Sequence, residues 1–133
     1  MAISPPLVLV VDDDPDTREL CVLTLGMAGF RTEAAENGRA ALDKATELRP
    51  DAILLDLMLP GMDGWEVCRQ LKSDVSTKRI PIVAVTGHAL VSTLESAQTV
   101  GCEAVITKPY LPEALIAEVR RVLDRAGRLA EAY

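Results

Sequence analysis

Apolar residues are grouped in short runs along the chain, and these runs predict five β-strands. Four runs are almost continuously apolar, namely Leu7 to Val11, Ala52 to Leu55, Ile82 to Val85 and Ala104 to Ile106. Continuous runs of this length are typical of parallel strands that are buried on both faces of a sheet. A weaker run, Phe30 to Ala35, alternates apolar residues with Arg31 and Glu33, which favours an edge strand.

Helical stretches of about 10 to 15 residues separate the apolar runs, so the predicted order is βαβαβαβαβα. Asp14 and Pro15 are suited to cap and open the first helix, and Gly101 is suited to end the fourth. Right-handed crossovers place helices on both faces of such a sheet. The sequence therefore predicts an open α/β domain, whose site would lie outside the carboxyl ends of the strands.

Length and composition favour a single domain. The chain has 133 residues and is 49% hydrophobic, which suits one compact core. We expect one domain over residues 1–133, with a core at about 7–126 and no output domain after the last helix. A net charge of -6, from 14 basic and 20 acidic residues, argues against direct nucleic-acid binding, which depends on clustered Lys and Arg.

The start of the chain and its cysteines predict a cytoplasmic protein. The first residues lack a basic region and the first apolar run ends in acids, which excludes a signal peptide and a membrane span. Cys21, Cys68 and Cys102 are far apart and form no Cys-x-x-Cys pattern, so we interpret them as reduced apolar filler. The single histidine, His88, excludes a His-rich metal site.

Polar residues follow four of the predicted strands at the edge where a site is expected. They are Asp12, Asp13 and Asp14, then Asp56, then Thr86 and Gly87, and finally Thr107, Lys108 and Pro109. Carboxylates that share one crevice repel one another, and either protonation or a hard divalent cation relieves that repulsion. Mg²⁺ is the natural candidate, because it favours one or two carboxylates together with water and phosphate oxygens.

A carboxylate, a hydroxyl and an ammonium beside Mg²⁺ are suited to phosphoryl transfer, which depends mainly on positioning and charge neutralisation. Asp56 is the best nucleophile, because it stands alone at the end of its strand and a sharp turn follows it. Attack by its carboxylate on phosphorus yields an aspartyl phosphate. Lys108 would neutralise one phosphoryl oxygen, and Thr86 would donate a hydrogen bond to another.

These residues also carry a resemblance to a known family. The segments are Val10-Val11-Asp12-Asp13-Asp14-Pro15, Leu55-Asp56-Leu57-Met58-Leu59-Pro60-Gly61-Met62-Asp63-Gly64, Val85-Thr86-Gly87 and Thr107-Lys108-Pro109. Together they resemble the CheY-like receiver domains of response regulators in two-component signalling. The resemblance covers nearly the whole chain, with the motifs in order and at the right spacing.

The resemblance implies a flavodoxin-like (βα)5 fold with strand order 2-1-3-4-5. It implies that Asp13, Asp56 and the backbone carbonyl of Met58 ligate Mg²⁺, that Asp12 acts through water, and that Thr86 and Lys108 contact the phosphoryl group. It further implies a signalling domain rather than an enzyme. The expected partners are a histidine kinase or histidine phosphotransfer protein, and a downstream protein target. No membrane partner is expected, and whether the domain forms a homodimer is left open.

Two other functions compete with this interpretation. A haloacid-dehalogenase-like phosphatase would use Asp12 as its nucleophile and Asp14 as the second acid of its first motif. That class also needs an acidic motif beyond the lysine, and the chain offers only Glu113 there. A flavin-binding module is the third candidate function, but the loop after the first strand lacks the Ser, Thr and Gly that would bind the flavin phosphate.

The chain departs from the receiver pattern at two positions. Val105 stands where receivers usually carry an aromatic residue, and Leu111 stands where a polar helix cap is expected before Pro112. Helical spacing also predicts how the first helix packs. We expect Leu20, Cys21, Thr24, Leu25 and Ala28 to face the sheet, and Val22, Leu23, Gly26 and Met27 to point outward. This apolar outward face is either ordinary surface, with Met27 packed against the last helix, or a docking surface for phosphotransfer helices or a second copy of the domain.

Overall fold

The structure is a computed structural model that describes residues 4–87 and 91–128, so His88 lies outside the described residues. Five parallel strands form one sheet in the order β2-β1-β3-β4-β5, which confirms the predicted order 2-1-3-4-5. The strands are β1 (Leu7–Val11), β2 (Arg31–Ala35), β3 (Ala52–Asp56), β4 (Ile82–Thr86) and β5 (Ala104–Thr107). Each strand begins and ends within one residue of its apolar run.

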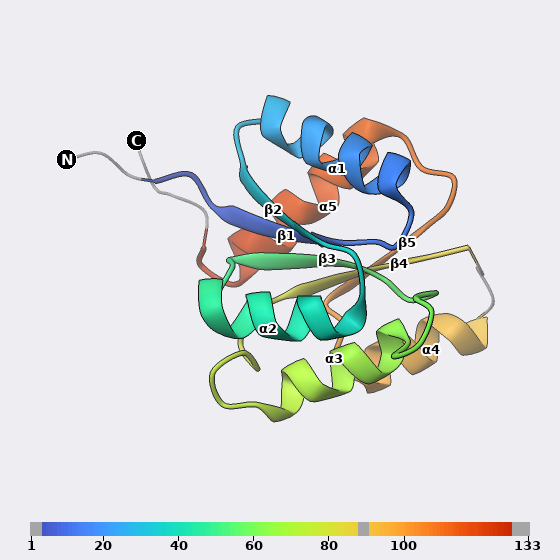
Figure 1. Cartoon of the computed structure of the whole chain (residues 1–133). Helices are drawn as coiled ribbons and strands as arrows, with labels where there is room; N and C mark the ends of the chain where they lie inside the picture. Colours follow the sequence, from blue (N-terminus) through green and yellow to red (C-terminus); the bar gives the residue numbers. More distant parts are fainter. Residues whose placement is uncertain (1–3, 88–90, 129–133) are drawn as a thin grey trace.

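Five helices cover the two faces of the sheet in a flavodoxin-like arrangement (Figure 1). They are α1 (Pro15–Met27), α2 (Gly38–Leu48), α3 (Gly64–Ser73), α4 (Val91–Thr99) and α5 (Pro112–Arg125). Helices α1 and α5 lie on one face, and α2, α3 and α4 lie on the other. None of the helices in the described part of the chain combines the length and the apolar character that a membrane crossing requires.

The strands β1, β3, β4 and β5 each contribute side chains to two separate core layers, which explains their continuous apolar runs. Val10 and Leu54 belong to the layer beneath α1 and α5, whereas their neighbours Leu9 and Ile53 belong to the layer above α2, α3 and α4. Alternate residues of a strand point to opposite faces, and both faces are covered here. The exposed residues of β2 are consistent with its position at one edge of the sheet, as its alternating pattern predicts.

Side-chain caps set the starts of three helices. The carboxylate of Asp14 accepts the backbone N–H of Thr17 at 3.1 Å, and the amide oxygen of Asn37 accepts that of Ala40 at 2.8 Å. Asp63 caps α3 in the same way. Leu111 precedes α5 without any side-chain cap, so the missing cap expected from the sequence is confirmed.

The packing of α1 corrects two residues of the predicted face. Leu20 is 63% exposed rather than packed on the sheet, and Val22 is half-buried against the core rather than turned outward. The buried side of α1 is centred on Cys21 and Leu25. Val22 lies three residues before Leu25 and therefore shares its side, whereas Leu20 falls on the side of the exposed Leu23.

Candidate functional site

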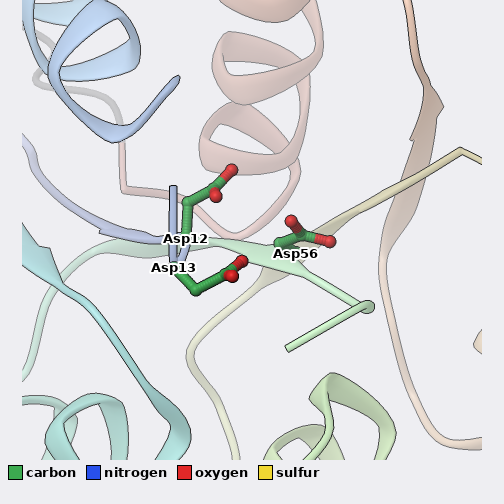
Figure 2. A group of neighbouring side chains, drawn as sticks. All are labelled: Asp12, Asp13 and Asp56. Atoms are coloured by element: carbon green, nitrogen blue, oxygen red, sulfur yellow. The ribbon is translucent and has the colours of Figure 1, made fainter. Parts of the chain in front are cut away.

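Three carboxylates converge at the carboxyl edge of the sheet, where two neighbouring strands end. Asp12 and Asp13 follow β1, and Asp56 is the last residue of the adjacent strand β3. Their ligand oxygens all lie within 4.8 Å of one another (Figure 2). We call these residues the acidic trio. Asp12 and Asp56 are buried, and Asp13 is exposed.

Asp12 is held in place from two sides. One carboxylate oxygen accepts the backbone N–H of Asp14 at 2.9 Å, and its backbone carbonyl accepts a hydrogen bond from the guanidinium of Arg18 at 2.8 Å. Burial raises the pKa of Asp12 above its ordinary value, the hydrogen bond from Asp14 opposes that rise, and the neighbouring charge of Asp56 adds to it. The negative charge on Asp12 is therefore costly without a cation.

The two carboxylate oxygens of Asp56 have different surroundings. Oδ1 accepts the backbone N–H of Met58 at 2.8 Å, and Oδ2 accepts a hydrogen bond from Nζ of Lys108 at 3.3 Å. The side chain of Asp56 is only 6% exposed. The backbone bond orients the carboxylate, and the ammonium of Lys108 partly balances its charge.

Lys108 reaches the acidic trio from the segment that follows β5. Its backbone N–H donates to the carbonyl of Thr86 at 2.8 Å, which places it directly after β5. Its Nζ also lies 3.9 Å from Oδ2 of Asp12. Burial lowers the pKa of Lys108, but the charges of Asp56 and Asp12 oppose this and the net pKa is raised. Lys108 is therefore a cation at neutral pH.

Thr86 and Met58 complete the residues that the sequence predicts for this edge. Thr86 is the last residue of β4, pairs in register with Thr107 and is 1% exposed. The backbone of Met58 contacts Asp56, while its side chain is 58% exposed. Six predicted residues thus lie at the ends of four strands, as follows: Asp12, Asp13, Asp56, Met58, Thr86 and Lys108.

The donor set fits a hard divalent cation. Such ions take carboxylate, carbonyl and water oxygens, and the acidic trio supplies three carboxylates whose ligand oxygens lie within 4.8 Å of one another. A cavity of about 410 Å³ opens beside it, with Asp13, Met58 and Trp65 in its lining. This cavity leaves room for water and for a phosphoryl group next to the carboxylates. The residues present could therefore hold a metal ion.

Gly64 allows α3 to begin close to the acceptor strand. A Cβ atom at this position would lie 2.4 Å from the backbone oxygen of Asp56 and 2.5 Å from Cα of Leu57. Only glycine permits so close an approach of two backbones. The turn before it contains Gly61, whose φ of 74° lies in the left-handed region that favours glycine.

Three residues near the site were not expected from the sequence. Arg18 holds Asp12 from one turn inside α1, Trp65 lines the neighbouring cavity, and Tyr110 hydrogen-bonds Cys21, with 3.2 Å between Oη and Sγ. Burial and that hydrogen bond raise the pKa of Tyr110. Trp65 directly follows the close-packed glycine, which is the one signal that could have identified it. Val105 packs against the layer of α2, α3 and α4.

Comparisons with known proteins agree with this geometry. Residues 8–120 match the family model for the response regulator receiver domain. The chain is 43% identical over 122 residues to the DNA-binding response regulator MtrA of Mycolicibacterium smegmatis, covering 89% of this chain and 50% of MtrA. It is 40% identical over 120 residues to the phosphate regulon transcriptional regulatory protein PhoB of Pseudomonas aeruginosa, covering 90% of this chain and 52% of PhoB.

A solved structure shows the same fold. The chemotaxis protein CheY4 of Vibrio cholerae superposes with a TM-score of 0.85 at 33% identity, covering 89% of this chain and 98% of CheY4. The chain spans about half the length of the curated relatives that it matches. These matches support the receiver interpretation and not the dehalogenase-like phosphatase. This chain belongs to the response-regulator receiver domains, the phosphorylation-dependent switches of two-component signalling.

Proposed function

We propose that Asp56 is the residue that accepts the phosphoryl group, in a reaction that depends on Mg²⁺. The observation that carries this proposal is the position of Asp56, buried beside Asp12 and Asp13 and within hydrogen-bond distance of Lys108. An oxygen of the Asp56 carboxylate attacks the phosphorus of a phosphohistidine. The new O–P bond forms as the N–P bond breaks, and the electron pair returns to the imidazole nitrogen.

The two carboxylate oxygens of Asp56 have different roles in this reaction. Oδ1 is the oxygen that the N–H of Met58 orients, and Oδ2 is the one that faces Lys108. As the phosphoryl group arrives, the ammonium of Lys108 shifts from the carboxylate to a phosphoryl oxygen and balances its charge. In this proposal Thr86, at the end of the neighbouring strand, donates its hydroxyl to a second phosphoryl oxygen.

The acidic trio and the backbone carbonyl of Met58 are the proposed Mg²⁺ site. Asp13 and Asp56 supply direct carboxylate ligands, and Asp12 holds a coordinated water. When bound, Mg²⁺ neutralises negative charge on the carboxylates and on the incoming phosphoryl oxygens. The raised pKa of Asp12 supports this assignment, because burial disfavours its charge and the neighbouring charge of Asp56 adds to that effect, and a bound cation relieves both.

The proposed donor is a histidine kinase or a histidine phosphotransfer protein, because response regulators are partners of histidine kinases. The phosphorylated domain then binds a downstream protein. MtrA is a DNA-binding regulator by name, but this chain matches about half of it. Because these 133 residues carry a net charge of -6, we assign to them the phosphorylation switch and not contact with DNA. We also propose that residues 1–133 form a single domain with a core at about 7–126.

Incubation of the protein with acetyl phosphate and Mg²⁺, followed by intact-mass analysis and phosphopeptide mapping, tests the acceptor assignment. We expect one phosphoryl group per chain on the native protein, located on Asp56, and none on an Asp56→Asn variant. Asp16→Asn, which changes an exposed acid in the first turn of α1, is the matched control and should label like the native protein.

Labelling located on Asp12 would favour the phosphatase instead. Full labelling of a folded Asp56→Asn variant at another residue would overturn the assignment. Labelling of the native protein in excess EDTA, to the same extent as with Mg²⁺, would overturn the metal requirement alone.

A further inference from the structure

Two buried cysteines that lie 34 residues apart in the sequence meet on the far side of the molecule from Cys21. Cys68 lies on α3, and Cys102 lies in the loop that precedes β5. Their Sγ atoms are 3.4 Å apart and share a hydrogen bond. Cys68 is 0% exposed and Cys102 is 7% exposed. The sequence alone suggests only apolar filler for both, but the structure brings them together.

The backbone segments that carry the two cysteines are held together by other contacts. We call the contact between α3 and residues 100–103 the α3–β5 join. The thiol of Cys68 donates to the carbonyl of Val100 at 3.5 Å, and Nζ of Lys72 lies 2.9 Å from a carboxylate oxygen of Glu103. A Cβ atom on Gly101 would lie 3.1 Å from Cγ of Lys72, so the two segments touch. The sulfurs therefore face each other across a packed contact.

We propose that Cys68 and Cys102 are a redox-active pair that forms a reversible intramolecular disulfide when the protein meets a peroxide. A disulfide bond requires the sulfurs to approach to about 2 Å, and the two Sγ atoms already lie 3.4 Å apart. The bond would join α3 to the start of β5 covalently. It would also close a loop across the α3–β5 join, where the native contacts already hold the ends together.

The two sulfurs differ in their access to a small oxidant and in their pKa. Cys102 lines a surface cavity of about 270 Å³, together with Gln98 and Val105, so a small oxidant has a route to it. The hydrogen bond from Cys102 lowers the pKa of Cys68. The same hydrogen bond, followed by burial, raises the pKa of Cys102. When the pair loses a proton, the charge therefore forms on Cys68, and Cys102 keeps its proton and donates it to Cys68.

The oxidation proceeds in two balanced steps. The thiolate of Cys68 attacks one oxygen of hydrogen peroxide, the O–O bond breaks, and a sulfenic acid and hydroxide form. The sulfur of Cys102 then loses its proton and attacks the sulfur of Cys68, forming the S–S bond and expelling a second hydroxide. The two protons released by the thiols convert the hydroxides to water. Two thiols are oxidised and one peroxide is reduced to two waters.

Cys21 provides an internal contrast. It belongs to the other core layer, beneath α1 and α5, whereas Cys68 and Cys102 belong to the layer of α2, α3 and α4. Its thiol is paired with the hydroxyl of Tyr110, and burial raises its pKa. The sheet thus separates Cys21 from the pair. The α3–β5 join also lies toward the amino ends of the strands, away from Asp56, so the oxidation does not depend on phosphorylation.

The test uses the full chain, treated with hydrogen peroxide and then denatured and alkylated with iodoacetamide. Intact mass should show the loss of two hydrogen atoms, and only one of the three cysteines should alkylate. Peptide mapping should link the peptides of Cys68 and Cys102, and dithiothreitol should restore three alkylatable thiols. Three alkylatable thiols after peroxide treatment, or a disulfide between two chains, would overturn the proposal.

Variants separate this pair from the other features of the chain. Cys21→Ala keeps the pair and should still lose two hydrogen atoms, whereas Cys102→Ala should not. Loss of two hydrogen atoms in Cys102→Ala would show that another pair reacts and would overturn the assignment. Asp56→Asn should oxidise like the native protein, so the result stands or falls independently of the acceptor proposal. Peptide mapping of the native chain decides the matter even where a cysteine variant fails to fold.

Discussion

Opposed charges set the behaviour of single residues in the site. Asp12 and Asp56 are buried close together, and the ammonium of Lys108 approaches both. Burial raises the pKa of Asp12, and the neighbouring negative charge of Asp56 adds to that rise. Removing a charge and removing a ligand should therefore have different effects on stability and on metal binding.

Without Mg²⁺, an Asp12→Asn variant should be more stable than the native protein at pH 7. The pKa of Asp12 is raised in the folded state, so the folded protein binds a proton more readily than the unfolded chain. Stability is therefore lost as the pH rises from the ordinary value of 3.8 through the raised pKa. Asparagine keeps an oxygen for the N–H of Asp14 but carries no charge. Thermal unfolding in EDTA should show a Tm higher by a few degrees.

The gain in Tm should shrink toward zero as the pH falls through the raised pKa of Asp12, because the native carboxyl is then neutral too. Adding Mg²⁺ at pH 7 should stabilise the native protein more than the variant. A variant that melts below the native protein at pH 7 in EDTA would contradict this account of the charge balance.

An Asp13→Asn variant should bind Mg²⁺ at least about tenfold more weakly, because it loses a direct carboxylate ligand. Trp65, the single tryptophan of the chain, lines the cavity beside Asp13 and reports binding by its fluorescence. Asp63→Asn is a close control, since Asp63 lines the same cavity but lies outside the acidic trio. Equal Mg²⁺ affinity of Asp13→Asn and the native protein would exclude Asp13 as a ligand.

At the scale of elements, close approach of backbones positions the site more than side-chain packing does. Helix α3 begins against the residues that follow β3, and Gly64 is the point of contact. The cap of Asp63 fixes the start of the same helix. By contrast, Gly26 on the exposed side of α1 has no atom within 4 Å of its ideal Cβ position. The two glycines should respond in opposite directions to the same substitution.

Gly64→Ala should lower the free energy of unfolding by about 2–4 kcal/mol, because the new methyl group meets the backbone of Asp56 and Leu57 and α3 must move. Gly26→Ala should raise it by about 0.5–1 kcal/mol, because alanine favours the helix and meets nothing. Urea unfolding monitored by circular dichroism measures both. Unchanged stability of Gly64→Ala would show that α3 is not held against β3 by this contact.

At the scale of the whole molecule, the sheet divides the surface into a face covered by α1 and α5 and a face covered by α2, α3 and α4 (Figure 1). The first of these faces exposes an apolar patch on α1, formed by Leu20, Leu23 and Met27, which are 63%, 56% and 89% exposed. The helix begins next to the acidic trio. We therefore expect a helical phosphotransfer partner that reaches Asp56 to contact this patch as well.

Replacing Leu23 and Met27 together by glutamate should reduce phosphotransfer from the partner histidine protein at least about tenfold, because charge disrupts an apolar contact. Labelling by acetyl phosphate should stay unchanged, because the small donor needs no contact with α1. Val75→Glu is the control, since Val75 is 81% exposed in the loop between α3 and β4. Undiminished phosphotransfer to the folded double variant would exclude the patch as a docking surface.

The sequence by itself determined the elements and the edge at which the site lies. Strands that are buried on both faces must be continuously apolar, so four of the five were visible as runs such as Ile82 to Val85. Parallel strands also carry their functional groups at one edge, so the sequence alone places Asp56 and Lys108 at the same edge of the sheet. The strand order 2-1-3-4-5 rested on the motifs, because local pattern alone does not choose neighbours.

Only the tertiary structure decided the contacts that depend on packing between distant segments. The apolar side of α1 was predicted correctly around Cys21 and Leu25, but not at Leu20 and Val22. Helical spacing defines which residues share a side, whereas the sheet and neighbouring helices set the rotation of that side. The meeting of Cys68 with Cys102 was equally invisible, because it depends on how α3 docks beside β5. Such pairs arise from three-dimensional packing and leave no periodic trace in the sequence.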